Sequence, residues 1–92
     1  MPKTLRHHDV APAHPGALVA EVIEHLGIGK AEMARRLGIT RTALYNVIDE
    51  KSAVSAEMAV RLERETGTSA DLLVRMQASF DLWRARKALE IA

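Results

Sequence analysis

The amino-acid sequence predicts an all-α domain of five helices, two of which form a helix-turn-helix. Aromatic residues make up only 3% of the chain, and no stretch alternates β-branched with polar residues. Apolar residues instead recur at spacings of three and four, and glycines at positions 27, 38 and 67 separate these stretches. With 92 residues, the chain supports one domain with a modest core, so we expect its stability to depend on a partner surface.

Residues 1–14 combine prolines and histidines with few periodic apolar residues, which predicts a flexible arm in front of a helix-turn-helix domain over residues 15–92. His7, His8 and Asp9 are metal-binding residue types, but no further ligand follows at helical spacing, so we expect no metal site. The chain contains no cysteine, no signal-peptide block and no apolar run of membrane length. We therefore expect a soluble cytoplasmic protein without a membrane partner.

The first and fourth helices are expected over residues 16–26 and 56–66. Pro15 opens the first, since proline is tolerated in a first turn, and Gly27 ends it. Its wide apolar stripe consists of Leu18, Val19, Val22, Ile23 and Leu26. Ser55 caps the fourth helix. Met58, Ala59 and Leu62 are expected to face inward there, and Glu57, Arg61, Glu63 and Arg64 to face water.

Two short amphipathic helices, expected over residues 30–37 and 41–48, meet at Gly38 and Ile39. Their steep crossing requires a residue with positive φ, which favours glycine, and Thr40 is expected to cap the second helix. The apolar sets are Met33, Ala34 and Leu37 on the first helix and Leu44, Val47 and Ile48 on the second. The remaining face of the second helix carries groups that bind phosphates and base edges: Arg41, Thr42, Tyr45, Asn46 and Asp49. This face predicts DNA binding.

The side chains of this region differ in the part of DNA that suits them. Arg41 and Asn46 are expected to read bases, because a guanidinium can fork to guanine and an amide to adenine. Tyr45 can contact a thymine methyl or a phosphate. The expected phosphate contacts are Lys30, Thr40, Thr42 and Lys51. Residues 28–55 hold five basic and three acidic residues, a net charge of +2, so two copies are needed to sum their affinity on one duplex.

The last helix, expected over residues 69–89, carries two apolar stripes, and Thr68 with Asp71 has the spacing of a capping box at its start. The inward stripe is expected to be Leu72, Leu73, Met76, Phe80 and Trp83. The second stripe is Val74, Ala78, Leu82, Ala85 and Leu89. One small domain can cover only one of them, so the second predicts a homodimer interface about a two-fold axis. The alternative is a frayed tail with exposed leucines.

Several short motifs together resemble a known family. They are His14-Pro15-Gly16, the Ala34/Gly38/Ile39/Leu44 pattern, Val54-Ser55, Ala70-Asp71-Leu72, Gln77 and Asp81-Leu82-Trp83. In this order they resemble the HigA (VapI-like) antitoxins, small members of the Xre (λ-repressor-like, Cro/C1) helix-turn-helix class. The resemblance covers residues 15 to about 86.

The resemblance implies a five-helix λ-repressor-like domain that dimerises and binds a palindromic operator over its own promoter. It also implies neutralisation of a small basic toxin, a RelE-like, ribosome-dependent mRNA endonuclease, without any cofactor. Lys30 stands where many Xre relatives carry glutamine. Asp49-Glu50-Lys51 stands where relatives read Asn-Gly-Lys, which predicts a strained turn at Glu50 and acidic groups close to the phosphates.

Two other function classes stay open. One is an Xre-type transcriptional repressor without a toxin partner, and the other is a protein-interaction module that has lost DNA binding. An enzyme is not expected, because the chain shows no cysteine, no paired buried carboxylates and no phosphate-cradling loop, and hence no candidate catalytic residue.

Overall fold

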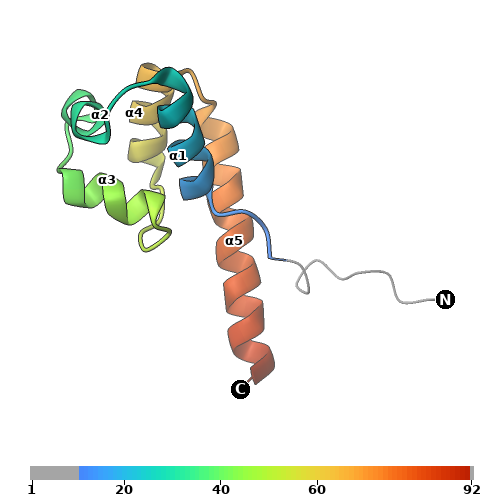
Figure 1. The fold of residues 1–92 in the computed structure, drawn as a ribbon. Helices are drawn as coiled ribbons and strands as arrows, with labels where there is room; N and C mark the ends of the chain where they lie inside the picture. Colours follow the sequence, from blue (N-terminus) through green and yellow to red (C-terminus); the bar gives the residue numbers. More distant parts are fainter. Residues whose placement is uncertain (1–10, 92) are drawn as a thin grey trace.

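The structure, a computed structural model, describes residues 11–91 and contains five α-helices and no strand within that range (Figure 1). The helices are α1 (Pro15–Leu26), α2 (Lys30–Leu37), α3 (Arg41–Ile48), α4 (Ala56–Thr66) and α5 (Ala70–Ile91). The predicted all-α class with a helix-turn-helix is confirmed. Residues 1–10, which hold most of the predicted arm together with His7, His8 and Asp9, lie outside the described residues.

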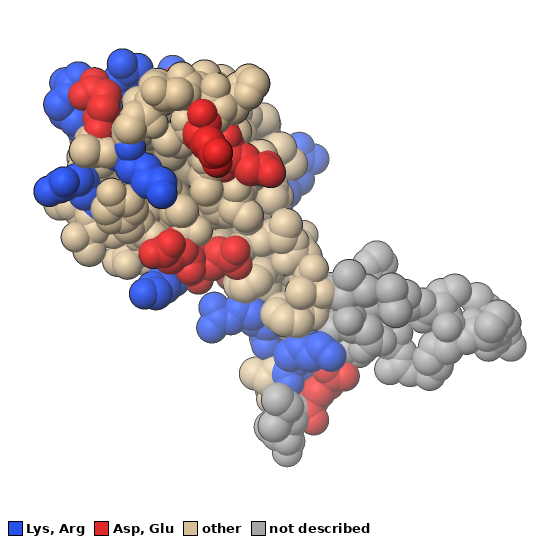
Figure 2. All heavy atoms as spheres, in the orientation of Figure 1, with Lys and Arg blue, Asp and Glu red and all other residues tan. Residues whose placement is uncertain are grey.

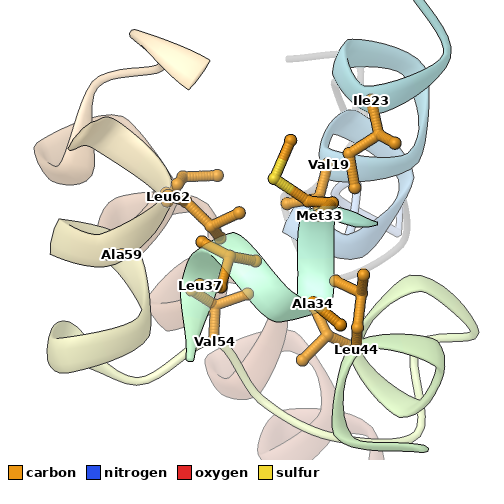
Figure 3. Close-up of a cluster of buried hydrophobic side chains, with 11 residues drawn as sticks. Val19, Ile23, Met33, Ala34, Leu37, Leu44, Val54, Ala59 and Leu62 are labelled. Carbon is orange, nitrogen blue, oxygen red and sulfur yellow. The ribbon is translucent and has the colours of Figure 1, made fainter. Parts of the chain in front are cut away.

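One apolar core joins all five helices (Figure 3). Its central members come from α2 and α3, where Met33 and Leu44 are fully buried. The other buried apolar side chains are Val19, Ile23, Ala34, Leu37, Val47, Val54, Ala59, Leu62 and Leu73. The inward faces predicted for α2 and α4 are thus confirmed, with Met58 partly buried against the core. Because α3 inserts Leu44 and Val47 into this core, the orientation of its opposite face is fixed.

The inward stripe of α5 differs from the predicted one at Leu72, whose side chain is 42% exposed. Leu73 is the residue that enters the core, and Leu72 lies about 100° around the helix from it. Met76, Phe80 and Trp83 are half-buried along the inward side. The far half of α5 extends beyond the other helices (Figure 1). The start of α5 also differs, since Ser69 rather than Thr68 caps it by accepting a hydrogen bond from the Leu72 N–H at 3.2 Å.

Gln77 is the polar residue of α5 that faces inward, and only 7% of it is exposed. Its Oε1 accepts a hydrogen bond from the Val54 N–H at 2.8 Å, and its Nε2 donates to Asp81 Oδ1 at 3.0 Å. Val54 belongs to the loop between α3 and α4. Gln77 therefore ties the chain segment that follows α3 to α5.

The prediction that the N-terminal arm includes His14 is wrong, because His14 belongs to the folded domain and only 3% of its surface is exposed. Its Nδ1 accepts a hydrogen bond from the Gly16 N–H at 2.9 Å and so caps α1. Its ring meets the Phe80 ring edge-on, with 4.9 Å between the centroids. The context of prolines and histidines concealed this role, since a cap is usually supplied by a short polar side chain.

Two kinds of feature are absent from the part of the chain that the structure describes. None of the helices combines the length and the apolarity needed to span a bilayer. No group of three or more His, Asp or Glu residues within residues 11–91 is arranged to hold a metal ion.

Candidate nucleic-acid interface

The turn between α2 and α3 has the geometry that a helix-turn-helix needs. Gly38 adopts φ 72°, in the left-handed region that disfavours residues with a Cβ. The Gly38 and Ile39 N–H groups donate hydrogen bonds back to the carbonyls of Arg35 and Ala34 and close the end of α2. Thr40 Oγ1 then accepts from the Ala43 N–H at 3.0 Å, which confirms its predicted role as the cap of α3.

Arg61 of α4, which lies outside the helix-turn-helix, forms a hydrogen bond to this turn. Its Nη1 donates a hydrogen bond to the Leu37 carbonyl at 2.8 Å, and its Nη2 donates to Glu57 Oε1 at 2.9 Å. The expectation that Arg61 only faces water is therefore wrong. Spacing along the sequence could not reveal this contact, because it is a tertiary one. The carbonyls at the end of α2 have no partner within their own helix, and the guanidinium reaches the Leu37 carbonyl from a position 24 residues along the chain.

The predicted DNA-binding residues come together along one side of α3 and at the two segments that flank it. Arg41, Thr42 and Tyr45 are exposed on α3, with Thr40 exposed in front of it, whereas Asn46 is half-buried. Lys30 begins α2 and is exposed, and its Nζ lies 5.7 Å from the centre of the Tyr45 ring. This cation–π contact joins the start of α2 to the middle of α3 and places a positive charge beside the exposed tyrosine.

The loop that follows α3 folds back on it. The Lys51 and Ser52 N–H groups both donate hydrogen bonds to the Asn46 carbonyl, at 2.8 and 3.1 Å. To reach this geometry Glu50 adopts φ 62°, the one positive φ among the described residues other than glycine. The predicted strained turn at Glu50 is confirmed. Lys51, predicted to contact phosphate, is exposed directly after it.

Glu50→Gly is expected to stabilise the fold by about 0.5–1 kcal/mol. Left-handed backbone costs a residue with a Cβ about 1–2 kcal/mol, and the greater freedom of glycine in the unfolded chain offsets about half of this gain. Thermal and urea unfolding measure the change. Glu50→Gln is the matched control, since it removes the charge and keeps the strain. Equal stabilisation by both variants would show that charge, not backbone conformation, is responsible.

The charges around α2 and α3 are mixed. Figure 2 shows basic side chains along the edge formed by α2 and α3, and acidic ones at the turn that follows α3. On α2, Glu32 accepts hydrogen bonds from the Nε atoms of Arg35 and Arg36, and these bonds lower the pKa of Glu32 to about 2. Because the folded-state pKa is depressed, this pairing is complete above the ordinary glutamate pKa and is lost as the pH falls toward 2. At neutral pH both arginines are thus partly neutralised within α2.

Comparison with known proteins identifies relatives of the same architecture. Virulence-associated protein A′ of Dichelobacter nodosus is 38% identical over 72 residues, which cover 77% of this chain and 63% of that protein. The chain thus spans less than two thirds of the length of this relative. The structure of the Pseudomonas aeruginosa antitoxin HigA with the higBA promoter matches at a TM-score of 0.77 and 32% identity, over 84% of this chain and 85% of that one.

The structure of the protein PA4674 from Pseudomonas aeruginosa, solved in complex with its operator DNA, matches at a TM-score of 0.76 and 32% identity over 86% of each chain. A family model described as helix-turn-helix matches residues 19–73, the stretch from α1 to the first turn of α5. This match covers more than half of the chain and includes the capped α3, the Gly38 turn and most of the core. The chain therefore belongs to the helix-turn-helix family of the Xre type.

Proposed function

We propose that the chain binds operator DNA through α3, whose exposed face enters the major groove. The observation that carries this proposal is the contrast between the two sides of α3. One side is fixed by the buried Leu44 and Val47, and the other presents the exposed Arg41, Thr42 and Tyr45. A helix that is held rigidly on one side and rich in hydrogen-bonding groups on the other is suited to direct readout.

The proposed contacts divide by position along this surface. Arg41, in the first turn of α3, and Asn46 are the base readers, and Tyr45 contacts a thymine methyl or a phosphate. The cation–π contact holds Lys30 close to Tyr45, where its ammonium group can meet the backbone of the same groove. The proposed phosphate contacts are Lys30, Thr40, Thr42 and Lys51.

The proposed binding unit is a homodimer formed through the second stripe of α5. Leu82 and Leu89 are 53% and 75% exposed, and Val74 is 39% exposed on the same side. An exposed stripe of this kind supports self-association about a two-fold axis, in which each copy covers the same patch of the other. The proposed interface residues are Val74, Ala78, Leu82, Ala85 and Leu89.

The proposed biological role is that of a HigA-type antitoxin of a type II toxin-antitoxin module, which represses its own promoter and neutralises a small basic, RelE-like mRNA endonuclease. The sequence motifs and the similarity to an antitoxin solved with its promoter support this role. Co-purification with the product of the adjoining gene, and rescue of growth when that gene is expressed, test it. Absence of such a partner would leave an Xre-type repressor without a toxin.

A protein-interaction module without DNA binding is the second candidate function. The exposed Asp49 and Glu50 at the end of α3 favour it, because two carboxylates close to the phosphates oppose DNA binding. A mobility-shift titration on the DNA upstream of the gene separates the two functions. Absence of a shift at low salt would favour the interaction module.

Two substitutions separate base reading from phosphate binding. Arg41→Ala is expected to cost about 1–3 kcal/mol at one base position, because a bidentate contact to guanine is lost. Lys51→Ala is expected to weaken binding to all sequences alike and to lower the slope of log K against log salt by about one. Competition titrations with single-base operator variants measure both effects. Equal weakening on every sequence by Arg41→Ala would refute its assignment as a base reader.

A further inference from the structure

α1 packs against both α3, the proposed recognition helix, and α5, the proposed dimer helix. α3 packs against α1 and α2, whereas α5 packs against α1 and α4. The orientation of α3 relative to α5 is therefore constrained through α1, in addition to the bond between Gln77 of α5 and Val54 in the loop that follows α3. The N-terminus of α1 is the place where groups from all three helices come together.

At that place the backbones of α1 and α3 are in direct contact. A Cβ built on Gly16 would lie 2.0 Å from the carbonyl oxygen of Val47, which is in the last turn of α3. No side chain fits between the two backbones. The position of Gly16 thus fixes the position of the C-terminal end of α3.

His14 links this contact to α5. Its Nδ1 accepts the hydrogen bond from the Gly16 N–H, and its buried ring forms an edge-to-face pair with the ring of Phe80 on α5. The planes of the two rings are inclined at 82°, an edge-to-face arrangement that aromatic pairs prefer. One side chain therefore contacts both the residue that abuts α3 and the helix proposed to carry the dimer interface.

Capping alone does not require a histidine. Serine, threonine, asparagine and aspartate are the preferred caps, and the caps of α3, α4 and α5 are the hydroxyls of Thr40, Ser55 and Ser69. Each of these hydroxyls accepts a bond from its own helix. His14 differs from these hydroxyl caps because it carries a ring, which packs against Phe80 on α5.

We propose that His14 is a positioning residue that fixes α3 relative to α5 and thereby sets the separation of the two recognition helices in the dimer. The inference rests on the proposed function, since such a separation acts only when a dimer spans two half-sites. A change of one base pair between half-sites rotates one of them by about 35° around the duplex. A rigid link between α5 and α3 makes the dimer sensitive to this rotation, and a loose link makes it tolerant.

His14→Asn separates the two contacts of His14, because asparagine retains the cap and lacks the ring. We select an operator from random DNA with the wild-type chain, then insert or delete one base pair at its centre and measure affinity for each spacing. The wild type is expected to prefer one spacing, and His14→Asn is expected to reduce that preference by about 2- to 30-fold. His25→Asn is the matched control and is expected to keep the preference, since His25 is an exposed histidine of α1, the helix that His14 caps.

A variant that is merely less stable would lose affinity equally for every spacing, so the ratio of affinities distinguishes positioning from general destabilisation. If His14→Asn keeps the wild-type ratio while the wild type binds as a dimer, the inference is wrong and the proposed function stands. If the wild type is monomeric or binds no DNA, the proposed function fails instead.

Amide hydrogen exchange tests the link without DNA. The Asp49 N–H donates to the Tyr45 carbonyl at 2.8 Å and closes the C-terminal end of α3. Both His14→Asn and Phe80→Ala are expected to speed exchange of this amide, although Phe80 lies on α5. Ser79→Ala, at the adjacent exposed position, is the control. Unchanged exchange at Asp49 in both variants would overturn the inference whatever the DNA experiment gives.

Discussion

Gly16→Ala is expected to destabilise the fold by about 2–4 kcal/mol, a large fraction of the stability of a small domain. An added methyl group would lie 2.0 Å from the Val47 carbonyl oxygen, and a backbone atom cannot swing aside as a flexible side chain can. α1 and α3 must therefore separate, and apolar contacts of Val19 and Leu44 are lost with them. Thermal unfolding should show a midpoint lowered by roughly 10 °C or more.

Gly29→Ala is the matched control for this prediction. Gly29 is also next to a helix start, has φ −65°, and an added Cβ there would meet no atom within 4 Å. We expect a loss of only about 0.5–1 kcal/mol, the difference between glycine and alanine as N-caps. A midpoint for Gly16→Ala as high as that of Gly29→Ala would show that α1 and α3 do not lie in backbone contact.

Leu82→Glu is expected to convert the proposed homodimer to a monomer and to weaken operator binding by about 100-fold or more. Leu82 lies in the middle of the second stripe of α5 and is 53% exposed in the single chain. In a two-fold interface the substitution buries one carboxylate from each copy, and a monomer loses the gain that comes from engaging two half-sites together. Sedimentation equilibrium measures the first effect and a mobility-shift titration the second.

Leu72→Glu on the same helix provides the control. Leu72 is 42% exposed but lies outside the second stripe, and an acidic residue in the first turn of a helix is favourable. This variant is expected to remain dimeric and to bind DNA as the wild type does. Dissociation by Leu72→Glu, with a stable dimer for Leu82→Glu, would place the interface elsewhere on α5.

Local sequence signals were sufficient for most of the fold. Apolar spacing predicted the five helices, and the caps Thr40 and Ser55 and the glycine turn at Gly38 depend on neighbours within four residues. The strained turn at Glu50 was also predictable, because the resemblance to HigA-type antitoxins implies glycine at this position and the chain has a residue with a Cβ there. Each of these features is decided by backbone conformation and short-range hydrogen bonding.

The features that were missed depend on partners far along the chain. His14 meets Phe80, Arg61 meets the Leu37 carbonyl and Gln77 meets the Val54 N–H, and none of these pairs lies within one helix or turn. An arginine that only faces water and one that also reaches a distant carbonyl have the same local pattern, so spacing could not distinguish them. Leu72 was placed inward because two adjacent leucines both fit a wide stripe, and only the packing of Leu73 decides which one enters the core.

The candidate DNA-binding residues on α3 were found from the sequence because Arg41, Thr42, Tyr45 and Asn46 are what remains after the apolar positions of α3 are removed. Their relation to one another was not predictable. The contact of Lys30 with Tyr45 depends on the turn at Gly38, which sets α2 against α3. The bonds that return the loop to the Asn46 carbonyl depend on the turn at Glu50. These contacts gather on one surface residues that are up to 21 positions apart in the chain.

Two copies of the chain are proposed to read a symmetric DNA site through α3. Selection from a random DNA pool, followed by measurement of the mass of the complex, tests this proposal most directly. We predict a two-fold symmetric site with half-sites about one helical turn apart, bound by a dimer, and loss of the selected base pattern with Arg41→Ala. An asymmetric site, a single bound chain, or no enrichment above the starting pool would contradict the claim.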